Sequence, residues 1–291
     1  MRVTQGMLTS GFLRNLSESY ERFARYQDQL TTGKKISKPS QDPVVAMMGI
    51  EYRGNLNHIE QYRRNLSTVH KWMDSTEDAL SSANAILQRV NELIVQASNG
   101  TYEANQRFDI GKEIEQLKKQ MATVANTQVA GKYIFNGTET SSKPVDLASN
   151  TVSTNTNAVE IAVNDGITIR VNIDPTSVFD LSLFQDLENL QNDLQTGASE
   201  QVIASYLPKI QQHLDNVITA RSELGARGDR VSMITQRLGS QHTIATKIMS
   251  NNEDADIEKV IMNLKMQESV HRAALSAGAR IMQPTLLDFL R

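Results

Sequence analysis

The most regular pattern in this sequence is a seven-residue repeat of apolar side chains between residues 59 and 97. Six successive heptad positions are Ile, Leu or Met, and the positions three residues later are mostly apolar or small. An unbroken heptad repeat is typical of a long helix that packs lengthwise on other helices. The two sets are Ile59, Leu66, Met73, Leu80, Leu87 and Ile94, and Tyr62, Val69, Thr76, Ala83, Val90 and Ala97.

Residues suited to helix ends flank this repeat. Asp42 can cap the first free amides, and Pro43 suits the first helical position because the N–H that it lacks would have no partner there. Asn99-Gly100 predicts the end of the helix. An apolar stripe from Ile110 to Val124 predicts a second helix that returns antiparallel to the first.

A second unbroken heptad repeat follows residue 200. Leu207 and Leu214 lie on the same face, and Pro208 should either bend this helix or mark its start. We interpret both long repeats as intramolecular core, because such helices can bury one another within one chain. The second repeat consists of Ile203, Ile210, Val217, Leu224, Val231 and Leu238.

The two ends of the chain carry weaker stripes. A first helix is expected over residues 4–32, with Gly33 as its C-terminal cap. Polar or small residues interrupt both stripes, and a short interrupted helix pair offsets little backbone entropy. We therefore expect both ends to be disordered or frayed in the monomer and ordered by packing between subunits. The stripes are Phe12, Leu16, Tyr20, Phe23, Gln27 and Leu30, and Ile257, Ile261, Leu264, Glu268, His271, Leu275, Gly278, Met282 and Thr285.

The middle of the chain changes to a strand-like period. Residues 133–138 are expected to form a strand and turn, and the polar residues 141–157 a surface loop. Alternating apolar residues on both sides of Asp165-Gly166 predict a β-hairpin. A short helix with Leu183, Leu187, Leu190 and Leu194 should then end at Gly197.

These patterns predict a mainly α fold: long antiparallel helices and a coiled-coil hairpin, forming a rod, with a small β-rich insert. We divide the chain into terminal assembly helices (1–40 and 243–291), a helical rod domain (41–130 and 198–242), and an outer insert with a short helix (131–197).

Composition narrows the functional classes. The net charge is −3, so no bulk charge favours a nucleic acid or an anionic membrane as partner, and a protein partner is expected. The chain has no cysteine, which excludes disulfides and thiolate chemistry. It has neither a signal-peptide apolar region nor 18 consecutive apolar residues, so export would need another route.

No pattern of catalytic residues is present. The histidines His58, His70, His213, His242 and His271 are far apart and show no metal-ligand spacing. The sequence has no G-x-S-x-G element and no complete phosphate loop. We predict no metal, no cofactor and no enzymatic activity.

Several blocks resemble the bacterial flagellin superfamily and, within it, the hook-associated protein 3 family of hook-filament junction proteins. Residues 32–43, TGKKISKPSQDP, are similar to the superfamily's G-K-x-I-x-x-P-S-D-D-P block, with Gln41 in place of the first Asp. Residues 221–227, RSELGAR, resemble its R-x-x-L-G-A-R element. The opening MRVTQ, the segment 131–137 and the C-terminal segment 281–290 are also similar, and the two ends resemble the junction proteins more than the filament flagellins.

The resemblance implies a structural, non-enzymatic protein of the bacterial flagellum. Its expected partners are hook-associated protein 1, flagellin, copies of itself in a ring, and an export chaperone, with no nucleic acid or membrane. It also implies secretion through the flagellar type III apparatus without a cleaved signal. The structural motif residues that it marks are Asp42, Pro43, Arg221, Leu224, Gly225 and Arg227.

By the family's pattern the terminal helices form the inner tube of the assembly. We predict that apolar residues of the two terminal stripes make the contacts between subunits. These residues are Leu16, Phe23, Leu30, Ile257, Leu264, Leu275, Met282, Leu286 and Phe289.

Three other interpretations stay open. A short flagellin that forms the filament itself would share nearly every block. A cytoplasmic coiled-coil adaptor would keep its ends packed and would not be exported. An enzyme housed in the insert, such as a peptidase, would need a metal motif such as H-E-x-x-H, which the insert lacks.

Overall fold

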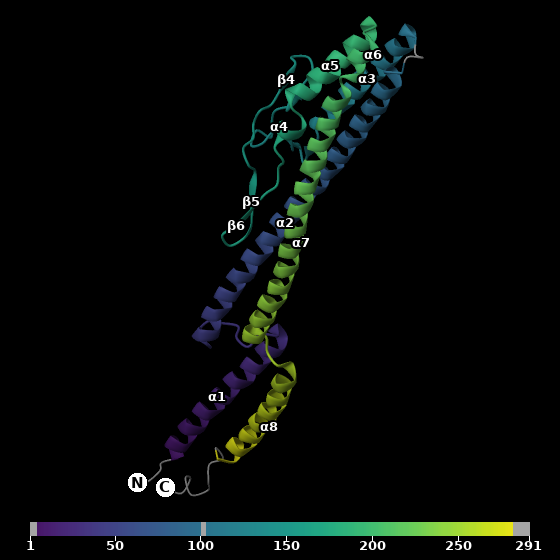
Figure 1. The fold of residues 1–291 in the computed structure, drawn as a ribbon. Helices are drawn as coiled ribbons and strands as arrows, with labels where there is room; N and C mark the ends of the chain where they lie inside the picture. The colour runs from purple at the N-terminus through teal and green to yellow at the C-terminus, as the bar shows by residue number, and fades with distance from the viewer. Residues whose placement is uncertain (1–4, 100–102, 282–291) are drawn as a thin grey trace, which may run out of the picture. The chain divides into compact units, whose positions relative to one another are not determined.

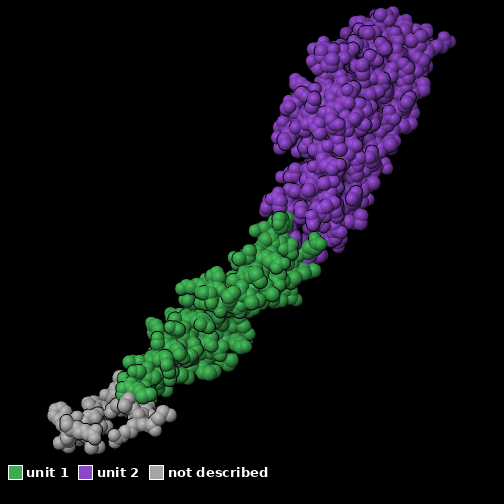
Figure 2. Space-filling view, turned by 90° about the vertical axis from the view of Figure 1, so that its left-hand side faces the viewer, with its two compact units in different colours: residues 1–58, 241–291 green, residues 59–240 purple. Residues whose placement is uncertain are grey.

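The computed structural model describes residues 5–99 and 103–281 and divides the chain into two compact units. Unit 1 comprises residues 1–58 and 241–291, and unit 2 comprises residues 59–240 (Figures 1 and 2). The sequence interpretation placed the first boundary at 40/41 instead of 58/59. The unit extends further because the first turns of the second helix bond to residues near 253, as described below.

Unit 1 contains α1 (Gln5–Thr32) and α8 (Ile257–Ile281), with the beginning of α2 (Pro43–Ala97) and the end of α7 (Leu207–Glu253). Gly33 has φ +68°, the left-handed value predicted for the cap of α1. The predicted start of α2 is also confirmed, because the Asp42 Oδ1 accepts hydrogen bonds of 3.1 Å from the amides of Val44 and Val45.

Unit 2 is built on the two long heptad repeats. All six first-set positions of α2 are at most 8% exposed, and so are the six positions of the second repeat, of which Ile203 lies in α6 (Glu200–Ala204) and the other five in α7. This confirms that both stripes are core. They pack with α3 (Ala104–Ala125) and α5 (Leu181–Thr196). Pro208 is the second residue of α7. Of the two predicted alternatives, a bend or a helix start, it therefore marks the start.

Three two-stranded antiparallel pairs are found among the described residues, in the insert and directly before it. The predicted hairpin forms from β5 (Glu160–Asn164) and β6 (Ile167–Arg170), with Gly166 at φ +65° in its turn. α4 (Pro175–Val178) follows, and its cap is the Asp174 side chain. The other two pairs are β1 (Gln128–Val129) with β2 (Lys132–Tyr133), and β3 (Val145–Asp146) with β4 (Thr151–Val152).

Two predictions for the insert are wrong. Of the strand expected over residues 133–138, only the first residue is in a strand, as the end of β2. Ala130 and Gly131 form a tight turn at positive φ, and this turn pairs β2 antiparallel with the preceding β1. Ile134 and Phe135 then enter the core, where the Phe135 ring lies edge-on to Phe179 at 4.8 Å. The loop expected over 141–157 contains the pair β3 and β4.

Candidate functional site

The terminal helices α1 and α8 form an antiparallel pair within unit 1 (Figure 1). A polar layer fixes their register: the Gln267 Nε2 donates to the Ser19 carbonyl at 3.1 Å and to the Ser19 Oγ at 2.9 Å. His271 Nδ1 lies 3.4 Å from the same hydroxyl, and its ring lies 6.1 Å from that of Tyr20. Because Ser19 is only 4% exposed, any shift in register would leave a buried polar group without a partner.

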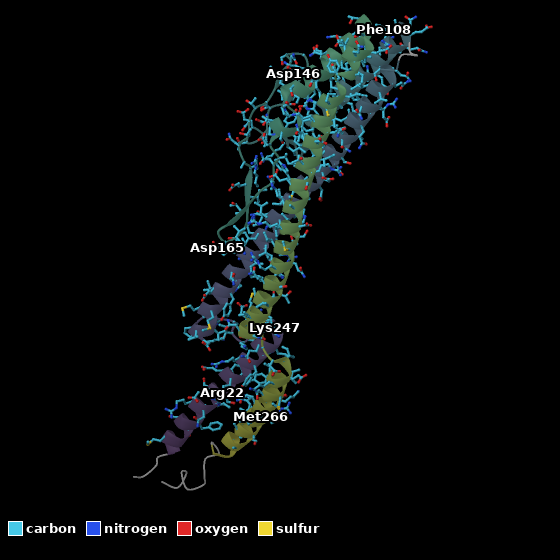
Figure 3. The ribbon with its side chains drawn as sticks, viewed as in Figure 1. Arg22, Phe108, Asp146, Asp165, Lys247 and Met266 are labelled. Atoms are coloured by element: carbon cyan, nitrogen blue, oxygen red, sulfur yellow. The ribbon has the colours of Figure 1, made fainter. Side chains whose placement is uncertain are left out.

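A two-helix pair can cover only one stripe of each helix, so the others face solvent. Ten large apolar residues of α1 and α8 keep between 38% and 67% of their accessible surface. Met266 can be found on α8 in Figure 3. Such a concentration of exposed apolar side chains marks an interaction surface. We call these ten residues the terminal apolar surface: Met7, Leu13, Tyr20, Leu30, Ile257, Ile261, Met262, Met266, Val270 and Leu275.

The predicted interface residues fall into three groups. Leu30, Ile257 and Leu275 belong to the terminal apolar surface. Leu16, Phe23 and Leu264 are half-buried, within α1 and α8 themselves. The remaining three, Met282, Leu286 and Phe289, lie outside the described residues.

A clasp formed by residues 33–35 and 253–255 joins the two chain segments that enter this helix pair. The Lys35 amide donates to the Glu253 carbonyl at 2.7 Å, and the Ala255 amide donates to the Gly33 carbonyl at 2.8 Å. Lys34 Nζ lies 2.7 Å from Asp254 Oδ1 and 3.4 Å from Glu253 Oε2. This pairing lowers the pKa of Asp254 and raises that of Lys34.

The first turns of α2 are bonded to the same clasp. Arg53 Nε lies 2.9 Å from Glu253 Oε1, and Asn252 Nδ2 donates to the Val45 carbonyl at 3.0 Å. A pocket of about 270 Å³ opens beside these contacts, and Ile36, Pro39 and Ile50 contribute apolar side chains to it. The block 32–43 therefore connects two helices and leaves an accessible pocket beside them.

Two family models match this chain, and they describe the two ends of the same protein family. The model of the bacterial flagellin N-terminal helical region matches residues 3–140, and that of the bacterial flagellin C-terminal helical region matches residues 207–290. Together they span about three quarters of the sequence. The chain belongs to the bacterial flagellin family.

Relatives of this flagellin-family chain include hook-associated proteins and flagellins. It is 26% identical to the flagellar hook-associated protein 3 of Escherichia coli (strain K12), over 95% of this chain and 96% of that protein. It is 25% identical to the flagellin of Bacillus subtilis (strain 168), over the full length of both. The fold is similar to a putative flagellar hook-associated protein from Vibrio parahaemolyticus, with TM-score 0.69 at 19% identity over 74% of this chain and all of that one.

Four of the motif residues that the family resemblance marks lie in unit 2: Arg221, Leu224, Gly225 and Arg227. Arg221 holds α7 to α2 through Glu77, whose Oε1 accepts from its Nε at 3.0 Å and from its Nη2 at 2.5 Å. Arg227 Nη1 donates to the carbonyl of Asn172 at 2.9 Å, where the insert returns to the helices. Leu224 between them is 4% exposed, and Gly225 has open space beside it.

Sequence reasoning missed two parts of the site in this flagellin-family chain. Met262, Met266 and Val270 recur at i, i+4 and i+8, a helical signal that could have been found beside the heptad stripe. Val44, Met47 and Ile50 on α2 are at least half exposed and lie next to the pocket or line it. They follow the cap residues directly, so their exposure could not be read from the pattern.

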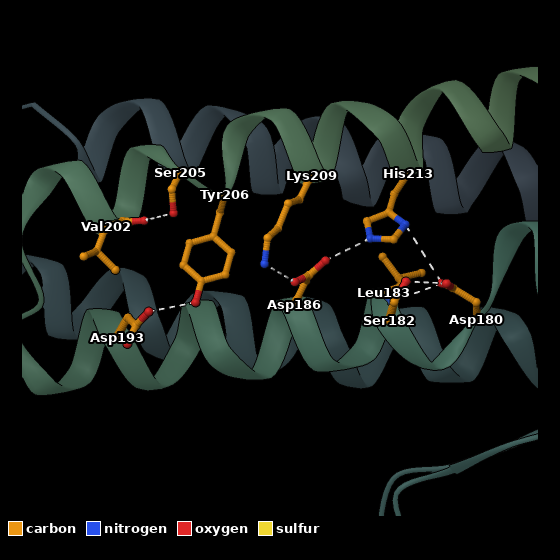
Figure 4. Close-up of polar contacts among 10 residues, drawn as sticks. All are labelled: Asp180, Ser182, Leu183, Asp186, Asp193, Val202, Ser205, Tyr206, Lys209 and His213. Carbon is orange, nitrogen blue, oxygen red and sulfur yellow. Dashed lines mark hydrogen bonds and ion pairs between the residues drawn. The ribbon is translucent and has the colours of Figure 1, made fainter.

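A polar network joins α5 to α7 and to Tyr206, the residue directly before α7 (Figure 4). Asp186 accepts from Lys209 at 2.8 Å and lies 3.2 Å from His213 Nε2. Tyr206 donates to Asp193 at 2.7 Å, and its burial together with this carboxylate raises its pKa. Each group has its partner, so the network ties two helices. Within residues 5–99 and 103–281, no group of three or more His, Asp or Glu residues is placed to hold a metal ion.

No helix within the described part of the chain is long and apolar enough to span a membrane.

Proposed function

We propose that this chain is a hook-filament junction protein, a structural component that joins the hook, through hook-associated protein 1, to the flagellin filament. The observation that carries the proposal is the terminal apolar surface on α1 and α8, in a chain similar to hook-associated protein 3 over almost its whole length. The surface needs a protein partner, and the similarity indicates which assembly supplies it.

The free energy of assembly comes from covering this surface with neighbouring subunits. Complete burial of a large apolar side chain contributes about 1.5–3 kcal/mol, and half-exposed ones contribute roughly half of that. For ten residues the sum is on the order of 10 kcal/mol, comparable with the ~4–15 kcal/mol cost of association. A subunit that is contacted on several sides in a ring can gain this energy, whereas one contacted on one side gains too little.

In this proposal residues 1–40 and 243–291 form the inner core of the ring, residues 41–130 and 198–242 the next layer, and residues 131–197 the outside. In the free monomer the inner helices pair along one stripe only and fray from their ends, and in the ring they are ordered throughout. Limited proteolysis of the monomer tests this division: early cuts are expected before about residue 35 and after about residue 243, and ends that resist the protease as well as unit 2 does would contradict it.

Export belongs to the same proposal. The chain travels through the flagellar type III apparatus without a cleaved signal, and a cytoplasmic chaperone covers the exposed residues of α8 until then. Its role is structural and requires no cofactor. The carboxylates of the α5–α7 network are engaged by Lys209, His213 and Tyr206, which supports a structural rather than a catalytic use.

Deleting the gene tests the proposal directly. Intact hooks without filaments, together with flagellin monomers released into the medium, would establish the junction role. A matched control is the same strain carrying the full-length gene on a plasmid, which should restore filaments. Unchanged motility and filaments would contradict the flagellar role itself.

The second candidate is a short flagellin that forms the filament. The full-length match to the Bacillus subtilis flagellin favours it. The same deletion separates the two, because loss of a filament protein would remove the major flagellin subunit from cells and medium instead of releasing it.

A further inference from the structure

Three arginines from two elements meet at a small pocket between the insert and α7. The pocket has a volume of about 120 Å³, and its lining residues are Thr168, Ile169, Arg170, Arg227 and Arg230. Arg170 ends β6, whereas Arg227 and Arg230 lie three residues apart on α7 and therefore on one face of that helix.

Two of the arginines are held in place by one buried residue. Asn172 is fully buried, accepts from the Val159 amide at 2.8 Å and donates to the Asn157 carbonyl at 3.0 Å. Its Oδ1 also accepts from Arg170 Nε at 3.3 Å, and its carbonyl accepts from Arg227 Nη1 at 2.9 Å. Both guanidinium groups are thus positioned before any ligand arrives, which reduces the entropy that binding must overcome.

The positive charge at the pocket is only partly balanced. Arg227 pairs with Glu223, and Glu160 accepts from the Thr168 hydroxyl at 2.9 Å. Arg170 bonds to Asn172 and to the Thr156 carbonyl, both uncharged. Among the residues that the structure describes, no carboxylate forms an ion pair with Arg170 or Arg230. Like charges three residues apart on a helix destabilise it, so a counter-ion at this point would be stabilising.

We propose that this pocket binds an oxyanion, either a carboxylate or a phosphate group. Guanidinium groups suit both because they stay positively charged and offer several N–H donors to the oxygens of an anion. The volume is well below the roughly 300–1,000 Å³ of sites for drug-sized ligands, so the pocket admits one charged group rather than a whole metabolite. A side-chain carboxylate of a partner subunit and a free phosphate share this chemistry.

The test is calorimetric titration of the full chain with sodium phosphate and, separately, with sodium acetate, at constant ionic strength adjusted with sodium chloride. The variant is Arg230→Gln, which removes an exposed guanidinium that makes no ion pair within the described residues. The matched control is Arg237→Gln, another exposed arginine of α7 outside the pocket.

At least one anion should bind the unmodified chain, with affinity lowered about tenfold or more in Arg230→Gln, as the loss of a charge-assisted hydrogen bond implies. Arg237→Gln should bind like the unmodified chain. A preference for acetate identifies a protein carboxylate as the source, and a preference for phosphate identifies a phosphate group. If neither anion binds, or if Arg230→Gln binds as tightly as the control, the proposal is wrong. Binding is measured on the isolated chain, so the result does not depend on the junction role.

Discussion

The ring of Phe12 on α1 packs directly on the backbone of Gly278 on α8. A methyl group placed on Gly278 would lie 2.1 Å from the Phe12 Cζ and 2.3 Å from its Cε1. Only glycine leaves room for the ring at this distance. What looks in the sequence like a gap in the C-terminal stripe is therefore the hole that receives an aromatic knob from the other end of the chain.

Gly278→Ala should weaken the pairing of α1 and α8. The methyl group displaces the half-exposed Phe12 ring, at a cost of about 1–3 kcal/mol, which exceeds the ~1 kcal/mol that alanine contributes as a better helix former. Hydrogen exchange of the α1 and α8 amides measures the effect. Gly11→Ala is the control: its position on α1 has open space, so exchange there should slow slightly. Equal slowing in both variants would contradict the packing.

The core stripe of α2 should respond differently from its exposed side chains. Leu87 is completely buried, and Leu87→Ala should lower the free energy of unfolding of unit 2 by about 2–5 kcal/mol, since it leaves a cavity. Val95 lies on the same helix but is 55% exposed, so Val95→Ala should change the free energy of unfolding by less than about 0.5 kcal/mol. Urea unfolding of both variants gives the comparison, and similar losses would show that the stripe is not core.

Much of the fold could be predicted because helix periodicity and helix ends depend on individual residues and their near neighbours in the sequence. The heptads of α2 and α7, the Asp42 cap and the Gly33 and Gly197 helix ends all depend on local chemistry, and the structure has each where expected. The short pair β3 and β4 has two residues a strand, too few for any alternation to show. The Ser19, Gln267 and His271 layer depends on a register between residues about 250 apart, which a single stripe cannot fix.

The pH dependence of the clasp follows from the Lys34–Asp254 pair. The hydrogen bond to Lys34 lowers the pKa of Asp254 below its ordinary 3.8, so its stabilisation is complete above that pH and is lost as pH falls through the lowered pKa. The hydrogen bond to Asp254 raises the pKa of Lys34 above 10.5, so its stabilisation is lost only as pH rises beyond that value. The clasp should be closed from about pH 4 to 10.

Asp254→Asn should remove the acid side of this profile. Exchange of the Lys35 and Ala255 amides, which donate across the clasp, reports its opening. The effect should be small and should shrink with added salt, since both side chains are more than 40% exposed. If the clasp opens at the same acid pH in Asp254→Asn and in the unmodified chain, the opening is due to a titratable group other than Asp254.

Assembly should depend on residues that the monomer leaves exposed. Met266 is 58% exposed on α8, so Met266→Asp should leave the circular dichroism and the free energy of unfolding of the monomer nearly unchanged. In a ring it would bury a charge without a partner, which costs several kcal/mol, and incorporation into flagella should fail. Leu264→Asp should also fail, but Leu264 is half-buried, so that variant disturbs the monomer as well.

The matched control for Met266→Asp is Met233→Asp, because Met233 is 65% exposed on the part of α7 that belongs to unit 2. Both changes replace an exposed methionine on a helix with the same charge. The measurement is the number of flagella, and the amount of variant protein in them, in cells that make either variant. It distinguishes the terminal apolar surface from the exposed surface of unit 2. If both variants are incorporated normally, the terminal apolar surface is not the contact between subunits. If both fail, the contact extends over unit 2 and the inner helices alone do not explain assembly.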